Sequence, residues 1–259
     1  MVGFGVAGVL MILLPILLLV ILKKRTHAPV MPVVVGAITF VVFALGLAMI
    51  PRYLLMMTDT EIARTIYSSV WLRYAVAGVI AGVFEETGRY VAFRFVLKKH
   101  TSKITALTYG LGHGGIECIM VAVTMFSYIA IGMMVNSGNG DMIVQGLEGE
   151  QLAMVTEQLE GYATQSFGMS MLAVLERMAI LFHTALSILV FKAVHDKKSR
   201  WLFPLAILFH SLLDFCIAFY ASGMLSALAL EIIFLVVNIS AITAAYLLVY
   251  KPMPEVMAE

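Results

Sequence analysis

Ionisable side chains lie in the middle of long apolar stretches of this 259-residue chain. The strongest group is Glu86, His113 and His210, which fall in three different stretches. A charged side chain at the centre of a bilayer costs about 2.5–3.5 kcal/mol on insertion scales, so such residues mark a functional site by default. A glutamate can act as general base toward water while a histidine positions that water. The same donors also suit Zn²⁺, and without an H-E-x-x-H motif the spacing leaves both chemistries open.

Further polar residues accompany these three at helical spacing. Pairs three or four positions apart share one face of a helix. The pairs are Glu86 with Arg89, His113 with Glu117, and His210 with Asp214. Together with Glu85 and His183, which also lie within apolar stretches, these residues are the candidate site residues of the chain. If a metal is present, the candidate ligands are His113, His210 and Glu86.

The depth of these groups in the membrane can be compared by counting residues from the basic flank of each apolar stretch. Five of them lie nine to twelve residues from a flanking Lys or Arg, namely Glu86, Arg89, His113, His183 and His210. At the rise of an α-helix this is roughly 14–18 Å for each. Four helices therefore present polar groups at one level, and a common pocket is expected. For a lone residue such as His183, an interhelical hydrogen bond is an equally good interpretation.

Composition fixes the class of protein. Hydrophobic residues make up 61% of the chain and charged residues 13%, with a mean hydropathy of +0.97. A soluble domain is less apolar and about twice as charged, so we predict an all-α polytopic membrane bundle. The expected spans are 2–22, 30–50, 71–97, 104–134, 168–192, 201–220 and 223–250. They leave room for one integral membrane domain over 1–259, with a catalytic core at about 70–220. A net charge of +1 argues neither for nor against a nucleic acid partner, and no basic patch interleaved with aromatic residues is present, so no nucleic acid partner is expected.

Basic residues predict the orientation. Alternate loops place eleven Lys and Arg on one side and three on the other. The larger set is Lys23, Lys24, Arg25, Lys98, Lys99, Lys103, Lys192, Lys197, Lys198, Arg200 and Lys251; the smaller is Arg52, Arg64 and Arg73. The larger set is expected in the cytoplasm, with the N-terminus outside and the C-terminus inside. The acidic 135–167 loop then lies outside as a solvated connector or a substrate gate, with a short surface helix expected at 151–161.

Three motifs, in this order, resemble those of the CAAX protease and bacteriocin-processing superfamily. They are the paired glutamates in Glu85-Glu86-Thr87-Gly88-Arg89, Tyr109-x-x-x-His113, and His210-Ser211-Leu212-Leu213-Asp214. Their details are most similar to the YhfC branch, which is described as intramembrane metalloproteases. His183 resembles a histidine of the related PrsW-type proteases. The arginine spacing, Asp214 in place of asparagine, and the extra acid Glu117 depart from the prenyl-CAAX endopeptidases.

The resemblance implies a function in the plasma membrane of a bacterium. An intramembrane protease would hydrolyse a peptide bond of a membrane-associated or transmembrane substrate. Glu86 would activate water with the help of His113, and His210 with Asp214 would stabilise the oxyanion or bind a metal such as zinc. Glu85 or Arg89 would orient these groups. Two other classes stay open: a proton-coupled transporter, since midplane carboxylates and histidines also serve as proton relays, and a non-catalytic scaffold resembling the gamma-secretase subunit related to this superfamily.

Overall fold

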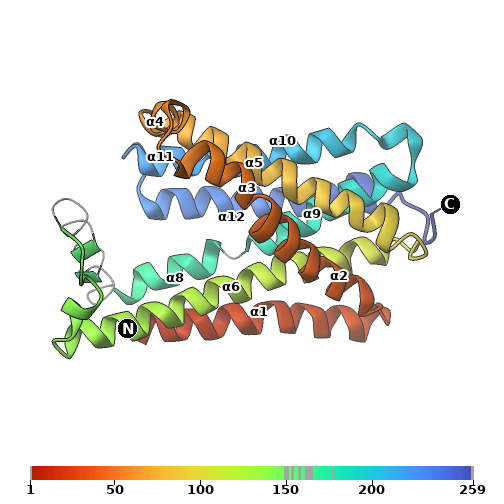
Figure 1. Cartoon of the computed structure of the whole chain (residues 1–259). Coiled ribbons are helices and arrows are strands. Elements are labelled where there is room, and N and C mark those ends of the chain that lie inside the picture. Colours follow the sequence, from red (N-terminus) through yellow and green to blue (C-terminus); the bar gives the residue numbers. More distant parts are fainter. Residues whose placement is uncertain are drawn as a thin grey trace. The chain divides into compact units, whose positions relative to one another are not determined.

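The protein is an assembly of helices (Figure 1). The computed structural model describes residues 2–148, 152, 155–156, 159–160, 166–176 and 178–257, and no β-strand occurs among them. This follows from the apolar composition. Lipid offers no hydrogen bonds to the backbone, and a helix satisfies every N–H and C=O within its own segment.

The first half of the described chain contains six α-helices. They are α1 (Val2–Thr26), α2 (Met31–Thr39), α3 (Met49–Arg52), α4 (Glu61–Tyr67), α5 (Val70–Val91) and α6 (Ile104–Asn136). Three π-helical segments continue them: η1 (Phe40–Leu47), η2 (Tyr53–Met57) and η3 (Ala92–Val96). Of the expected surface helix at 151–161, most positions fall outside the described residues.

The second half is built in the same way. Its helices are α8 (Phe167–Glu176), α9 (Ala179–His195), α10 (Leu202–Phe215), α11 (Ile217–Ala221) and α12 (Ala227–Ala245). The short 3-10 segments η4 (Gly140–Met142) and η5 (Lys197–Ser199) precede α8 and α10, and the π-helical η6 (Tyr246–Tyr250) extends α12.

Five helical segments among the described residues are long and apolar enough to cross a membrane. They are Val2–Thr26, Met31–Met57, Ile104–Asn136, Lys197–Ala221 and Ala227–Tyr250. A sixth is obtained if α4 and the α5–η3 helix count as one span, although they meet at a bend of 109°. A polytopic all-helical membrane protein, predicted from composition, is thereby confirmed. Seven spans and the orientation of the termini stay predictions.

The stretch predicted as a single span at 168–192 is instead two helices. Helix α8 ends at Glu176 and α9 begins at Ala179, and the two belong to different compact units. Helix α9 has 17 residues, so it is about 26 Å long, at the lower limit for crossing the hydrocarbon core. Hydropathy summed over the whole stretch does not detect this break, because both helices are apolar.

The described chain forms two compact units, and α1 and α6 contribute to both. The smaller unit joins α1 up to Leu14, α6 from Glu117, and α8. Its interior is a cluster of Phe4, Ala7, Met11, Ala122 and Met125. The larger unit contains the remaining helices, and a single domain over 1–259 stays a prediction.

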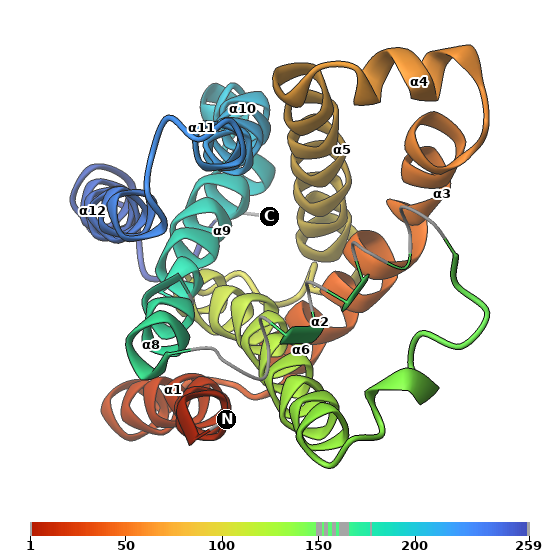
Figure 2. The same ribbon diagram turned by 90° about the vertical axis from the view of Figure 1, so that its left-hand side faces the viewer.

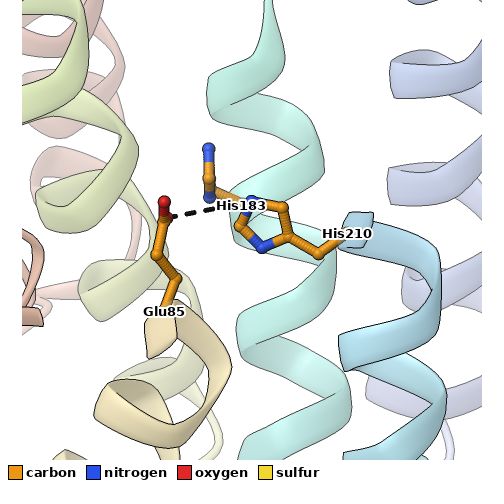
Figure 3. A group of neighbouring side chains, drawn as sticks. All are labelled: Glu85, His183 and His210. Atoms are coloured by element: carbon orange, nitrogen blue, oxygen red, sulfur yellow. Dashed lines mark ion pairs between the residues drawn. The ribbon is translucent and has the colours of Figure 1, made fainter. Parts of the chain in front are cut away.

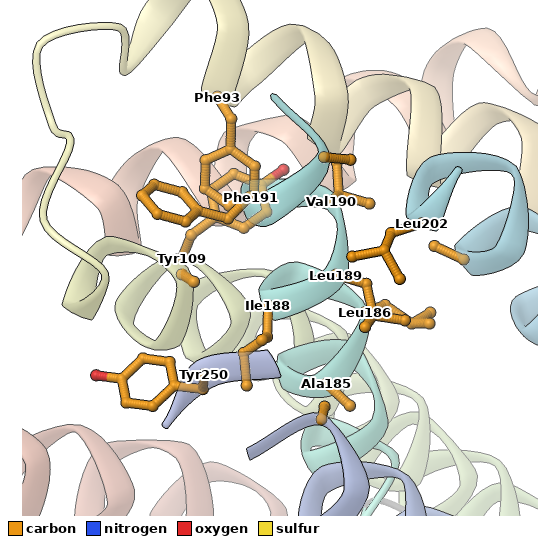
Figure 4. Close-up of a cluster of buried hydrophobic side chains, with 14 of the residues drawn as sticks. Phe93, Tyr109, Ala185, Leu186, Ile188, Leu189, Val190, Phe191, Leu202 and Tyr250 are labelled. Atoms are coloured by element: carbon orange, nitrogen blue, oxygen red, sulfur yellow. The ribbon is translucent and has the colours of Figure 1, made fainter. Parts of the chain in front are cut away.

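Helix α9 is the central element of the larger unit. It packs against α5, α10 and α12, and the end-on view in Figure 2 places it between them. From Ile180 to Ala193 nearly all of its side chains are buried. Figure 4 shows the apolar cluster around it, in which Phe191 packs edge-on against Phe93 at 5.3 Å between ring centroids. Phe93 also packs on Tyr109 of α6 at 4.6 Å. This packing fixes the level of His183, which lies on the same helix.

Glycines allow α5 and α10 to lie in backbone contact. Gly78 and Gly82 on α5 are four residues apart and therefore on one face. A Cβ at Gly78 would lie 2.7 Å from the Ser211 carbonyl oxygen, and one at Gly82 would lie 2.8 Å from the Ile207 carbonyl oxygen. Small residues permit this close approach of helices in lipid. The approach brings the glutamates at 85 and 86 within reach of α10.

The glycine-rich turn of α6 has the same role toward α9. A Cβ at Gly110 would lie 2.6 Å from the Cα of Thr184, and one at Gly114 would lie 2.9 Å from the Cα of Ile180. The arrangement sets His113 beside His183.

We expect Gly82→Ala to destabilise the protein by about 1–3 kcal/mol, because the added methyl group meets backbone atoms that cannot rotate away. Gly46→Ala is the matched control, since its new Cβ would meet no atom closer than 3.5 Å. The control is expected to be neutral or more stable by up to about 1 kcal/mol. Unfolding of both variants in detergent, followed by helical circular dichroism, measures the difference. Equal stabilities would contradict the proposed helix contact.

Candidate active site

Four helices of the larger unit supply the buried polar residues. Helix α5 supplies Glu85, Glu86 and Arg89, and α6, α9 and α10 supply His113, His183 and His210. All six side chains are buried, with residue exposures of 0 to 7%. The five residues placed at one depth by sequence thus come together with Glu85 in the larger unit, and a pocket at this place stays a prediction. Figure 3 shows Glu85, His183 and His210 approaching one another from three helices.

Glu86 is enclosed between a cation and a histidine. Its Oε2 lies 3.1 Å from Nε of Arg89, and neither side chain is exposed. Its Oε1 lies 2.8 Å from Nδ1 of His210. An ionised carboxylate only accepts, so the Nδ1–H of His210 donates and the neutral ring carries its lone pair on Nε2. Glu86 thus fixes both the orientation and the tautomer of His210.

Glu85 occupies the other side of the His210 ring. Its Oε2 accepts a hydrogen bond from Nε2 of His113 at 3.0 Å. The same oxygen lies 3.8 Å from Nε2 of His210. The two adjacent glutamates therefore have different surroundings: Glu86 is held by partners and fully enclosed, whereas the Glu85 side chain is 9% exposed.

Arg89 connects α5 to the backbone of α9. Its Nη1 donates to the carbonyl oxygen of His183 at 2.6 Å and to Oγ of Ser187 at 2.8 Å. The hydroxyl of Ser187 donates to the same carbonyl at 2.7 Å. The contacts of this single guanidinium to Glu86, Ser187 and His183 fix where the His183 ring leaves its helix.

Glu85, His183 and His210 form a group with the donor types of a metal site. One ligand atom from each lies within 4.8 Å of the other two. Two imidazoles and a carboxylate, with a further position open, are a common ligand set of catalytic zinc. The placement of Glu86 behind Nδ1 of His210 matches the carboxylate–histidine pairing that orients metal ligands. Of the ligands expected from sequence, this group includes only His210.

His183 is the member of the group whose present contacts fit a cation least well. Its Nδ1 lies 3.4 Å from Nη2 of Arg89. A guanidinium has no lone pair, so Nδ1 is the acceptor and the neutral ring carries its proton on Nε2. Binding a cation through Nε2 would move that proton to Nδ1, so the contact to Arg89 would have to open. The donor types and spacing of the group fit a metal, and the long Arg89 contact is the one that must change.

Of the two further residues named from the sequence, Asp214 lies at the margin of the cluster. Oδ2 of Asp214 is 4.0 Å from Nε2 of His210, and its side chain is 36% exposed. Glu117 follows His113 by one turn of α6 but belongs to the smaller compact unit. The role of Glu117 therefore stays a prediction.

Sequence reasoning missed two contributors to the site. Ser187 was not identified because a serine in an apolar helix most often bonds to its own backbone, as it also does here. Gly78 and Gly82 carried a readable signal, a G-x-x-x-G pair one turn before the glutamates.

The fold and the cluster together define a polytopic membrane protein with a buried group of histidines and glutamates. Comparison with known sequences makes this more specific. A model of the YhfC intramembrane metalloprotease family matches residues 10–235, so the chain belongs to that family. It is 33% identical over 234 residues to the uncharacterized membrane protein YhfC of Bacillus subtilis (strain 168), covering 88% of each chain. No solved structure matches. The predicted family and the multi-pass membrane location are confirmed.

Removing the buried cation of Arg89 is expected to lower the stability of the protein strongly. Arg89→Met leaves the enclosed Glu86 carboxylate without its ion pair and should destabilise the protein by about 3–5 kcal/mol. The double variant Arg89→Met with Glu86→Gln removes both charges and should recover part of that loss. Detergent-solubilised proteins compared by equilibrium unfolding provide the measurement. A single variant within about 1 kcal/mol of wild type would mean that the pair contributes no more than an exposed one.

Proposed function

We propose that this protein hydrolyses peptide bonds of substrates that reach the buried cluster from the membrane. The observation that carries the proposal is the convergence of Glu85, His183 and His210, whose ligand atoms lie within 4.8 Å of one another. The family it belongs to, described as intramembrane metalloproteases, supports the same reaction class.

The two glutamates would have separate roles. Glu85 is the carboxylate that faces the histidine group, so we assign to it the contact with the reacting water or with a metal. Glu86 holds Nδ1 of His210 and pairs with Arg89, which suits a residue that orients a neighbour. The role of base, expected for Glu86 from sequence, is thereby moved to Glu85.

The steps at the chain's own residues follow ordinary acid–base chemistry. A carboxylate at position 85 takes a proton from water as the oxygen attacks the peptide carbon, and the proton then passes to the leaving amine. His113 holds that carboxylate in place through its 3.0 Å hydrogen bond. With Nδ1–H bound to Glu86, His210 would donate to the developing oxyanion only from a ring protonated on both nitrogens. Asp214, whose Oδ2 lies 4.0 Å from Nε2 of His210, would favour that protonated ring. A zinc ion, when bound by Glu85, His183 and His210, would supply a Lewis acid for the carbonyl and a more acidic water.

Cleavage of a fluorogenic transmembrane peptide in proteoliposomes tests the assignment. Glu85→Gln should lower kcat about 100-fold or more, the usual contribution of a general base. Glu61→Gln changes an exposed acid on α4 and serves as the matched control. An active Glu85→Gln variant beside an inactive, folded Glu86→Gln variant would return the role of base to Glu86.

Metal content is tested apart from activity. We expect the purified protein to retain stoichiometric zinc, measured by mass spectrometry of the metal, and His183→Ala or His210→Ala to lose it. His100→Ala removes a histidine outside the cluster and should retain the metal. Glu86→Gln is expected to weaken binding about 10–100-fold, the effect of losing a partner that orients a ligand. Full activity of a metal-free wild-type protein would instead support a glutamate mechanism without metal.

A further inference from the structure

A polar cavity lies in the larger unit, away from the histidine cluster. It has a volume of about 600 Å³ and is lined by two segments far apart in the sequence. One segment is the end of the α5–η3 helix with the turn that follows it. The other is the end of α9 with the η5 turn. Figure 1 shows both segments on its right-hand side, where the α5–η3 helix and α9 end.

The charged lining of this cavity is entirely basic. Among the described residues, six basic side chains contribute and no acidic one does. They are Arg94, Lys98, Lys99, His195, Lys197 and Arg200. Thr101 adds a hydroxyl, and Phe93 and Phe95 supply apolar walls.

Nearby acidic groups pair with lysines that do not line the cavity. Asp196 binds Lys192 at 2.9 Å and accepts from the hydroxyl of Ser199 at 2.7 Å. Glu255 pairs with Lys103 at 2.9 Å. Within the described part of the chain, none of the five Lys and Arg residues of the lining has an ion pair. These like charges repel one another, and an anion in the cavity would relieve that repulsion.

The orientation rule for membrane proteins does not account for this arrangement. That rule requires basic residues near one membrane surface, and the exposed lining cations meet it, as do Lys198 and Lys251 outside the cavity. It does not require basic residues from two distant segments to line one cavity. Two arginines and three lysines converging on one cavity suit a ligand with several anionic oxygens.

We propose that this cavity binds a phosphate-bearing ligand through Arg94, Lys98, Lys99, Lys197 and Arg200. His195 has a fixed orientation in the lining, because its Nδ1 donates to the carbonyl oxygen of Phe191 at 2.9 Å. In the neutral ring Nε2 then carries the lone pair, so anion binding is assigned to the five Lys and Arg residues and not to His195. Two sources share this chemistry: the headgroup of an anionic phospholipid and a soluble phosphate compound. The volume is within the range of small-ligand sites.

The test uses the full chain in phosphatidylcholine nanodiscs. Inorganic pyrophosphate is titrated by calorimetry, and cardiolipin retention from mixed micelles is measured by native mass spectrometry. Arg94→Gln with Arg200→Gln removes one cation from each segment. This variant should weaken whichever probe binds roughly tenfold or more, given the usual contribution of a basic residue near an anionic lipid. Added salt should weaken binding as well.

The matched control is Lys198→Gln with Lys251→Gln, which removes the same charge from outside the cavity. It should leave binding within about twofold of wild type. Pyrophosphate binding alone would identify a soluble ligand, and cardiolipin retention alone a lipid headgroup. If neither probe binds, or if both double variants lose binding equally, the proposed site is overturned. Unfolding curves of the variants verify that each is folded.

Discussion

The buried ion pair between Glu86 and Arg89 is the constraint on which the larger unit depends. Two charges without solvent exposure must be satisfied entirely by protein, because a low-dielectric interior offers no water to replace a missing partner. Arg89 meets this requirement by reaching the backbone of α9, and Glu86 meets it by binding His210 of α10. These contacts fix the positions of α5, α9 and α10 along their axes relative to one another. The convergence of Glu85, His183 and His210 follows from that alignment.

Close helix packing and the polar network support each other. Lipid supplies little driving force for bringing helices together, so contacts between backbones and buried hydrogen bonds must provide it. Gly78 and Gly82 let α5 approach α10, and Gly110 and Gly114 let α6 approach α9. Hydrogen bonds of 2.6–3.0 Å from the side chains of α5, α6 and α10 to neighbouring side chains and to the backbone of α9 then become possible. The histidine cluster therefore lies beside close backbone contacts between the helices that supply it.

Adjacent residues of one helix point about 100° apart, and this separates two identical side chains into two environments. Glu86 faces the arginine and the protonated nitrogen of His210. Glu85 faces His113 and the lone-pair side of the same ring. Both oxygens of Glu86 are thus occupied by Arg89 and His210. The Glu85 carboxylate is the one that faces the histidines and could contact water or a metal. The proposed division between orienting a histidine and contacting the reacting water rests on this asymmetry.

The sequence alone determined that the protein lies in a membrane, that it is helical and to which family it belongs, because hydropathy and helical periodicity are local properties. It also predicted which polar residues lie at a common depth. It predicted Glu86, His113 and His210 as the centre of the site. Only the tertiary structure decided that ligand atoms of Glu85, His183 and His210 lie within 4.8 Å of one another. It also decided that α8 and α9 are separate helices. These outcomes depend on the rotation of each helix about its axis, which is set by contacts between residues distant in sequence, and spacing along one helix carries no information about its neighbours.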